Sequence, residues 1–247
     1  MILLFGGTAD TVPLANLIVS SGRRVLISTL TDHLDFSSLD PRAQRRHGPL
    51  RLDDLEEFIG AYQFTQIIDA THPYAQVVQS NIQELAGHLK LPLIRFERAE
   101  SSFEGYNVIY VSDHEEAAKL ISKRDWRAFL TIGSRNLKHY SSHKAVARIL
   151  DQEASLEEAL ASGFQRNNLI SRRGPFTLEE NIEHLKKTQA QVLVTKDGGE
   201  AGHVLEKLMA TKALGLPTIV IKRPERERSG LWVTSYEELM QKLGELP

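Results

Sequence analysis

The chain opens with MILLFGGTADTVPLANLIVSSGRRVLIST (residues 1–29), and this stretch decides its fold class. The fully apolar run 2–5 predicts a buried strand, and apolar residues three and four apart between residues 10 and 20 predict a helix. A second run, residues 24–29, predicts the next strand. A strand, a tight turn, a helix and a second strand form a βαβ unit, so we expect a parallel sheet.

The same alternation continues to the end of the chain. Further strands are expected at residues 66–70, 91–96, 108–111, 128–132, 145–150, 169–171, 192–195 and 218–221, and helices at 52–62, 73–89, 115–122, 156–161, 178–187, 203–214 and 236–243. Residues 30–50 are polar and are expected to form a long loop. A polar segment at residues 98–106 suggests a division into two domains, 1–98 and 99–247.

The composition limits the chemistry that this chain can perform. It has 247 residues, no cysteine, and a formal net charge of −2 from 30 basic and 32 acidic residues. Without cysteine, a zinc–thiolate site, an iron–sulfur cluster and a cysteine nucleophile are excluded, and no metal site is expected. The lack of a basic excess argues against nucleic-acid binding. No stretch has the length of a transmembrane helix and the start lacks signal-peptide features, so we expect a cytoplasmic protein with no membrane contact.

Gly6, Gly7 and Thr8 form a glycine turn between the first strand and the first helix. Such a turn suits a diphosphate, because the missing Cβ atoms admit the phosphate and the helix N-terminus offers unpaired N–H groups. Thr8 is a candidate helix cap or phosphate ligand. The full G-x-G-x-x-G spacing is absent, so a turn that needs glycine for geometry alone remains the alternative.

The choice between the two nicotinamide coenzymes depends on the end of the second strand. An acidic residue there favours NADH, whereas hydroxyls and arginines favour NADPH. The strand ends in Ser28 and Thr29, no carboxylate follows before Asp32, and Arg46 lies farther along the loop beside Arg45. The pattern favours NADPH, with NADH possible; a solvated loop is the alternative interpretation of the arginines.

Asp69, Ala70, Thr71, His72 and Tyr74 belong to a second motif, at the carboxyl end of the predicted strand 66–70. Ligands of open α/β sheets bind at this edge, and a histidine can donate a proton near neutral pH. The alternative is that the aspartate and threonine cap the following helix and the histidine is merely exposed.

The GGT opening and DATHPYA (residues 69–75) together resemble the hallmark pair of the precorrin-6A reductase family of cobalamin biosynthesis. Further segments resemble that family in the same order along the chain: LPLIRFER (91–98), LTIGSRNL (130–137), RIL (148–150), RGPF (173–176), VTKDGG (194–199) and RP (223–224). The chain departs from the family at Ala99 and Phe103, where proline and tryptophan are usual, and in the less glycine-rich loop 46–49.

The resemblance implies an α/β fold of two Rossmann-like domains with mainly parallel sheets and a cleft between them. It also implies a reaction: reduction of one double bond of the precorrin-6A macrocycle, or of its cobalt form, by NADPH or NADH. The protein itself would need neither a metal nor a flavin. Whether cobalt is in the ring, and whether the chain is a monomer or a small homo-oligomer, stays open.

The implied substrate is a tetrapyrrole with many carboxylates, which guanidinium groups and backbone amides would bind. The candidate contacts are His72, Tyr74, Arg95, Arg148, Gly174, Phe176, Lys196, Gly198 and Gly199. Arg98 and Arg172 are expected to be surface charges, and a core phenylalanine is the alternative for Phe176. His72 and Lys196 are the candidate proton donors, with bound water as a third possibility.

Two other functions remain to be separated from this one. A short-chain dehydrogenase needs a Tyr-x-x-x-Lys pair, and Tyr140 and Lys144 have this spacing, although that enzyme class places the pair on a long helix and this segment is short. A nucleotide-binding sensor would bind NAD(P) without turnover.

Overall fold

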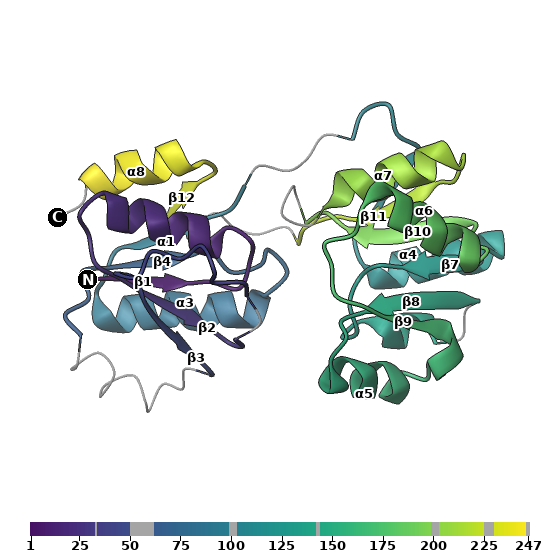
Figure 1. Cartoon of the computed structure of the whole chain (residues 1–247), viewed down its shortest axis with the longest axis horizontal. Coiled ribbons are helices and arrows are strands. Elements are labelled where there is room, and N and C mark those ends of the chain that lie inside the picture. The colour runs from purple at the N-terminus through teal and green to yellow at the C-terminus, as the bar shows by residue number, and fades with distance from the viewer. Residues whose placement is uncertain are drawn as a thin grey trace. The chain divides into compact units, whose positions relative to one another are not determined.

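The computed structural model describes residues 1–32, 34–49, 62–98, 103–141, 144–198, 203–224 and 230–245. The chain forms two compact units: Met1–Ala99 together with Glu225–Pro247, and Glu100–Pro224. Each unit contains its own six-stranded sheet, and every strand pair in both sheets is parallel (Figure 1).

The first sheet has the strand order β12-β5-β4-β1-β2-β3. Its strands are β1 (Ile2–Phe5), β2 (Val25–Thr29), β3 (Gln44–His47), β4 (Gln66–Asp69), β5 (Leu93–Phe96) and β12 (Leu231–Val233), and the helices of this unit are α1 (Thr11–Ser20), α3 (Gln76–Leu89) and α8 (Tyr236–Glu245). Because β1 is apolar throughout and the two middle residues of β4 are isoleucines, successive side chains fill a core on each face. Leu4 and Ile68 pack with α1 and α8 on one face, and Leu3 and Ile67 pack with α3 on the other (Figure 1).

The second sheet has the strand order β6-β11-β10-β7-β8-β9. Its strands are β6 (Val108–Val111), β7 (Ala128–Leu130), β8 (Ala145–Ile149), β9 (Leu169–Ser171), β10 (Val192–Lys196) and β11 (Thr218–Ile221). Four α-helices accompany it, α4 (His114–Arg124), α5 (Glu153–Ala161), α6 (Leu178–Lys187) and α7 (Val204–Ala213), with two short 3₁₀ helices, η1 (Leu137–Tyr140) and η2 (Arg166–Asn168). The core on one face joins Phe129, Val146 and Leu193 to Leu185 of α6 and Ala210 of α7.

The two sheets repeat one topology. In chain order, β1 to β5 of the first sheet occupy the same places as β7 to β11 of the second. The sixth strand differs in origin, since β12 comes from the end of the chain whereas β6 precedes the other strands of its sheet. Each sheet is doubly wound, and its strand order reverses between β1 and β4 in the first and between β7 and β10 in the second. Ligands of such sheets bind at this reversal, on the carboxyl side of the strands.

The structure corrects the sequence analysis at two strands and one boundary. β3 lies inside the predicted loop 30–50; its sequence, QRRH, is polar because the strand is an exposed edge, so no hydrophobic pattern marked it. β12 is only three residues long and was not predicted. Because β12 pairs with β5, residues 231–245 belong to the first unit, whereas the predicted domain 99–247 gave them to the second. The predicted helix 52–62 lies almost entirely outside the described residues.

Candidate functional site

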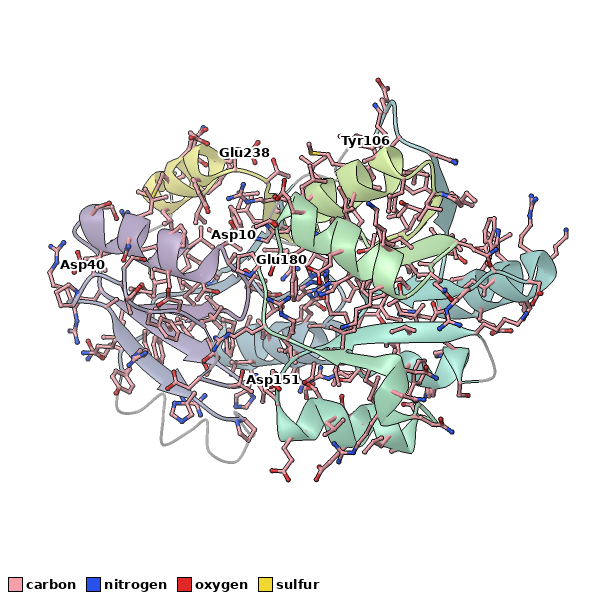
Figure 2. The ribbon with its side chains drawn as sticks, turned by 45° about the vertical axis from the view of Figure 1, so that its right-hand side comes forward. Asp10, Asp40, Tyr106, Asp151, Glu180 and Glu238 are labelled. Atoms are coloured by element: carbon pink, nitrogen blue, oxygen red, sulfur yellow. The ribbon has the colours of Figure 1, made fainter. Side chains whose placement is uncertain are left out.

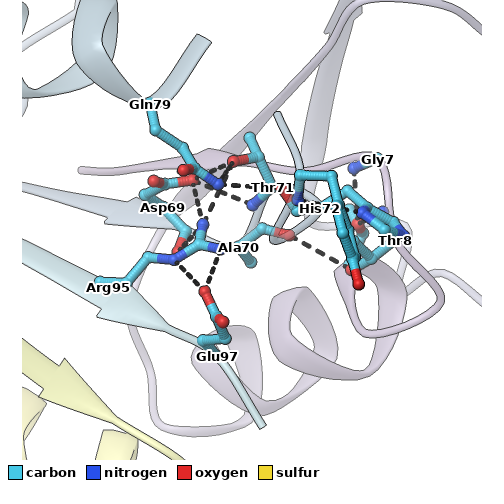
Figure 3. A network of polar contacts seen from close by, with 11 residues as sticks. Gly7, Thr8, Asp69, Ala70, Thr71, His72, Gln79, Arg95 and Glu97 are labelled. Atoms are coloured by element: carbon cyan, nitrogen blue, oxygen red, sulfur yellow. Dashed lines mark hydrogen bonds and ion pairs between the residues drawn. The ribbon is translucent and has the colours of Figure 1, made fainter. Parts of the chain in front are cut away.

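The strand reversal of the first sheet brings together the two motifs predicted to act there. The glycine turn follows β1, and Ala70, Thr71 and His72 follow β4, the neighbouring strand. The Thr8 hydroxyl donates to the Ala70 carbonyl oxygen at 3.2 Å, which joins the two turns directly (Figure 3). The residues predicted to bind the coenzyme and those of the DATHPYA motif therefore share one edge of the sheet.

Both glycines of the turn have a physical reason to be glycine. A Cβ atom on Gly6 would lie 2.7 Å from the Thr11 Oγ1 atom and closer still to its methyl group, and Thr11 is completely buried. Gly7 has a φ of 127°, a backbone conformation that side chains disfavour. The backbone amides of Gly7 and Thr8 donate to the Thr11 hydroxyl at 3.0 and 3.2 Å. The Thr11 side chain therefore stabilises this conformation of the turn.

The N-terminus of α1 provides donors for an anion. Within the described part of the chain, the amides of Ala9, Asp10 and Val12 donate to no acceptor, and Pro13 has no N–H group. The ten-residue helix also places the positive end of its dipole here. A Cβ atom on Gly7 would meet no atom within 4 Å, so the backbone beside these amides is open, as anion sites at helix N-termini require.

A buried ionic network supports the turn after β4. Asp69 is 3% exposed, and its Oδ1 atom accepts hydrogen bonds from the Thr71 amide at 2.9 Å and the Thr71 hydroxyl at 2.7 Å and pairs with Arg95 at 2.8 Å. Arg95 also pairs with Glu97 at 2.7 Å, and Gln79 donates to the His72 carbonyl oxygen at 2.9 Å (Figure 3). These contacts tie the backbone amide of Thr71 and the carbonyl group of His72 to the side chains of Asp69 and Gln79, which are both buried.

His72 and Tyr74 are the accessible side chains of this turn. The Tyr74 amide donates to His72 Nδ1 at 3.3 Å, and the two rings lie 5.4 Å apart. His72 is exposed and Tyr74 half-buried. Arg95, in contrast, is 5% exposed and its guanidinium contacts Asp69, Thr71 and Glu97. With this burial and these contacts, Arg95 stabilises the fold of the first unit. Its predicted contact with the substrate stays a prediction.

The carboxyl ends of β2 and β3 place a guanidinium group next to hydroxyl groups. Arg46 of β3 pairs in register with Ser28, and its Nη1 donates to the Ser28 hydroxyl at 2.9 Å and to the Gly48 carbonyl oxygen at 3.2 Å. The Thr29 hydroxyl donates to the Thr31 carbonyl oxygen at 2.8 Å. Asp32, the first carboxylate after the strand, is exposed and lies 3.7 Å from Arg45. The predicted cluster of Ser28, Thr29 and Arg46 thus forms at this edge.

The strand reversal of the second sheet has a different chemistry. The Thr131 hydroxyl donates to the Val194 carbonyl oxygen at 3.0 Å, which bridges β7 and β10. Lys196 ends β10 and is half-buried; burial, and secondarily the charge of Arg135, lowers the pKa of its ammonium group. The Gly198 amide donates to the Lys196 carbonyl oxygen at 2.9 Å, whereas Gly199 lies outside the described residues.

A neutral histidine belongs to the same electrostatic environment as Lys196. His114 Nδ1 lies 3.1 Å from the hydroxyl of Tyr140, which is fully buried, and its ring stacks on His139 at 5.8 Å. Burial, followed by the charges of Lys196 and His139, lowers the pKa of His114 to about 4. The imidazole is therefore uncharged at neutral pH, and its Nδ1 shares a hydrogen bond with the Tyr140 hydroxyl.

Arg148 of β8 forms a second cationic group in this unit. It is 7% exposed, donates to Asn181 Oδ1 at 2.9 Å, and lies with its Cζ atom 3.7 Å from the centre of the Phe176 ring. Burial lowers the pKa of Arg148 to about 10, so the guanidinium still carries its charge at neutral pH. Gly174 leaves room for the same ring, because a Cβ there would lie 3.0 Å from Phe176. The structure therefore brings Arg148 and Gly174 together at the Phe176 ring; their predicted contact with the substrate stays a prediction.

Comparison with known proteins decides the family. A family model described as Precorrin-6x reductase CbiJ/CobK matches residues 1–244. The chain belongs to this family. The cobalt-precorrin-6A reductase of Priestia megaterium is 33% identical over 250 residues, which cover 98% of each chain. That of Methanocaldococcus jannaschii is 31% identical over 229 residues, 91% of this chain and 90% of that protein.

A solved structure confirms the fold. A CobK precorrin-6A reductase superposes with a TM-score of 0.76 at 25% identity, over 99% of this chain and 96% of that one. Family membership and this similarity confirm both the predicted resemblance and the predicted α/β class, and they make the chain an oxidoreductase of the Precorrin-6x reductase family.

The short-chain dehydrogenase alternative finds no support in the geometry. Tyr140 is completely buried at the end of η1 and bonded to His114, whereas Lys144 pairs with the exposed Asp125 at 2.8 Å. The two side chains therefore do not share a helix face. Among the described residues, no group of three histidines, aspartates or glutamates is placed to hold a metal ion, and no described helix is long and apolar enough to span a bilayer.

Sequence reasoning missed the cluster of Asp10, Arg98 and Tyr236, which the structure places next to the predicted glycine turn. Asp10 sits at the start of α1 and bonds to Arg98 and Tyr236. Arg98 was expected to be a surface charge and is instead half-buried in this contact. The signal was weak, since one aspartate after a glycine turn is a common helix start and nothing in the sequence links it to residue 236. Arg172 does lie at the surface, where it pairs with Glu180 at 2.8 Å.

Proposed function

We propose that this chain is an NADPH-dependent reductase that saturates one double bond of the precorrin-6A macrocycle in cobalamin biosynthesis. The single observation that carries the proposal is the reversal of the first sheet, where a glycine turn with unbonded helix amides faces the DATHPYA turn within a reductase family. Two relatives named cobalt-precorrin-6A reductase support the cobalt-bearing ring as the substrate.

The first unit would hold the coenzyme. Gly6, Gly7 and Thr8 would contact its pyrophosphate, with the α1 amides as donors. Ser28, Thr29 and Arg46 would surround the 2′-phosphate of NADPH, since this edge has a guanidinium and no carboxylate before Asp32. The backbone of Asp69, Ala70 and Thr71 would border the nicotinamide half. The bound coenzyme supplies the hydride, and these residues supply its position.

The second unit would hold the macrocycle. Lys196 and Arg148 suit its carboxylates, and Phe176 with its guanidinium neighbours suits the flat face of the ring. The Gly198 amide would have to give up its bond to the Lys196 carbonyl oxygen to bind a carboxylate. From the first unit, His72 and Tyr74 would reach the substrate, since both are accessible at the turn after β4. The cleft between the two domains remains a prediction from the sequence.

The reaction adds two groups to one double bond: hydride to one carbon and a proton to its neighbour. Lys196 is our proposed proton donor, because burial lowers the pKa of its ammonium group and so makes it a stronger acid. His72 is the second candidate for the proton donor. Its side chain is exposed, so it could contact the substrate without a change in the turn. Hydride transfer itself requires positioning and the exclusion of water rather than a nucleophile.

The substrate assignment is tested by oxygen-free assays of NADPH oxidation with cobalt-precorrin-6A and metal-free precorrin-6A in parallel. We expect stoichiometric oxidation of NADPH, a macrocycle product heavier by two hydrogens, and the higher kcat/KM with the cobalt form. Binding of NADPH without turnover of either ring would indicate a sensor. Turnover of an unrelated compound alone would indicate another oxidoreductase.

The coenzyme assignment is tested by Arg46→Ala. Loss of this guanidinium should raise the KM for NADPH about 10- to 100-fold, the range expected for one charge-assisted contact with phosphate, and leave the KM for NADH nearly unchanged. Arg45→Ala is the matched control, because Arg45 is the exposed neighbour on the same strand and turns toward Asp32 and Phe36. Equal effects on both coenzymes would contradict the assignment.

A further inference from the structure

Asp10 occupies an unexpected place for a carboxylate. It directly precedes α1, is 7% exposed, and makes no side-chain capping bond to the helix (Figure 2). The positive end of the helix attracts this carboxylate as it would attract a phosphate, and two anions at one helix end repel each other. An uncompensated charge on Asp10 would therefore oppose pyrophosphate binding at the adjacent glycine turn.

The structure compensates this charge with two side chains. Oδ1 of Asp10 accepts a hydrogen bond from Arg98 Nε at 2.8 Å and from the Tyr236 hydroxyl at 2.7 Å, and it pairs with Arg98 Nη2 at 2.7 Å. Arg98 Nη2 also donates to the Tyr236 hydroxyl oxygen at 2.8 Å. One carboxylate oxygen thus faces a full positive charge and a phenol, and the group as a whole is neutral.

The compensating groups are held in place by packing. The Tyr236 ring stacks on the buried Phe96 ring at 5.5 Å, and the Arg98 guanidinium carbon lies 5.1 Å from the centre of the Tyr236 ring. The hydrogen bond to Asp10 raises the pKa of Arg98, and burial, helped by Asp10, raises the pKa of Tyr236. Arg98 therefore stays charged and the phenol stays protonated, so both remain donors.

We propose that Arg98 and Tyr236 form a charge clamp on Asp10 that keeps the N-terminus of α1 attractive to the coenzyme pyrophosphate. Arg98 is in this sense a positioning residue, because it acts through Asp10 and not on the reacting atoms. The clamp rests on the proposed function, since it presumes that a dinucleotide binds at Gly6 and Gly7. It also gives α8 a role at the coenzyme site, because Tyr236 is the first residue of that helix.

The clamp is tested by Arg98→Met, which removes the charge and keeps most of the volume, alone and combined with Asp10→Asn. NADPH Kd, KM and kcat are measured for each. In Arg98→Met, Kd and KM for NADPH should rise at least about tenfold, as one uncompensated charge implies, with kcat at saturating NADPH within about threefold of wild type. Asp10→Asn in that background should restore most of the affinity. The ratio of variant to wild-type Kd should shrink as salt is added.

Several controls separate the clamp from a loss of structure. Arg98→Lys, which keeps the charge, should retain most of the affinity. Lys144→Met removes an exposed ion pair with Asp125 in the other unit and should leave NADPH binding unchanged. Thermal denaturation checks the folding of every variant.

Three results would overturn the clamp. Arg98→Met that binds NADPH like wild type would show that no compensation is needed. Failure of Asp10→Asn to restore affinity would show that the loss has another cause. A rise confined to the KM of the macrocycle would make Arg98 a substrate contact. Wild-type protein that does not bind NADPH at all would instead contradict the proposed function.

Discussion

The strand reversals of the two sheets have the same topology and differ in the segment that leaves the first central strand. After β1 the chain makes the turn Gly6–Thr8 and enters a ten-residue helix, and the amides of Ala9, Asp10 and Val12 at its start donate to no acceptor among the described residues. After β7 it makes a turn at Gly133 and enters only the four-residue 3₁₀ helix η1. The second unit instead has Lys196 in the electrostatic environment of His114 and, separately, Arg148 against the Phe176 ring.

This difference in the segment after the first central strand indicates which part of a doubly wound sheet selects the ligand. The strand order provides an edge at which groups from distant segments meet, and both units have it. A long helix that begins at that edge provides amides and a dipole for a phosphate, whereas a single 3₁₀ turn does not. The second unit instead has the side-chain cations Lys196 and Arg148, which under the proposed function would bind the carboxylates of the substrate.

The largest effect is expected at the second site, from Lys196→Met. Loss of the proposed proton donor should lower kcat about 10²- to 10⁴-fold. Because the donor must be protonated, wild-type kcat should fall as pH rises through the lowered pKa of Lys196, and the variant should lack this fall. Lys212→Met, an exposed lysine of α7, is the matched control. A variant that keeps wild-type kcat would remove proton transfer from the second site.

The next effect compares the buried ion pairs of the two sheets. Arg95→Met leaves Asp69 buried without its partner and should lower the free energy of unfolding by about 3–5 kcal/mol. Arg223→Met, which removes the cation 3.6 Å from the buried Asp197 carboxylate in the second unit, is the matched comparison. Denaturant unfolding measures both. Asp69→Asn should recover part of the Arg95→Met loss, and no recovery would mean that packing, not charge, sets the cost.

The two turns themselves are compared with Gly6→Ala and Gly133→Ala. The first forces a methyl group against the buried Thr11, which should cost about 1–3 kcal/mol and raise the NADPH Kd more than about tenfold. The second has open space but a φ of 79°, so only a strain of about 1 kcal/mol is expected, with NADPH binding unchanged. Calorimetry with and without NADPH measures both effects. Weaker NADPH binding in Gly133→Ala would mean that the coenzyme has been assigned to the wrong unit.

The smallest effect is an acid sensitivity of the second unit. The pKa of His114 is about 4 in the folded chain and 6.5 in the unfolded chain. As pH falls, this imidazole therefore becomes protonated in the unfolded chain before it does so in the folded chain, which favours unfolding. The stability contributed by the neutral imidazole is therefore complete above pH 6.5 and is lost as pH falls toward 4. Partial exposure of the ring limits the loss to about 1 kcal/mol. His114→Asn should abolish this part of the pH dependence, and an unchanged profile would contradict it.

Much of the fold could be predicted because the central strands contain short buried apolar runs, such as ILLF of β1 and VLV of β10, and the long helices are amphipathic. β3 and β12 could not, since an exposed edge strand such as QRRH has no hydrophobic signal and a three-residue strand is too short to show one. The glycine turn and DATHPYA could be located because their residue types are constrained locally. The contact of Asp10 with Tyr236 joins residues 226 positions apart, and only the folded chain reveals it.

The most direct test of the account is a crystal structure of the chain with NADP⁺ bound. We predict that the pyrophosphate lies beside Gly6 and Gly7, within hydrogen-bonding distance of the Ala9, Asp10 or Val12 amide, and that the 2′-phosphate contacts Arg46. A coenzyme bound instead beside Thr131 and Lys196 of the second sheet, with the turn after β1 left open, would contradict it.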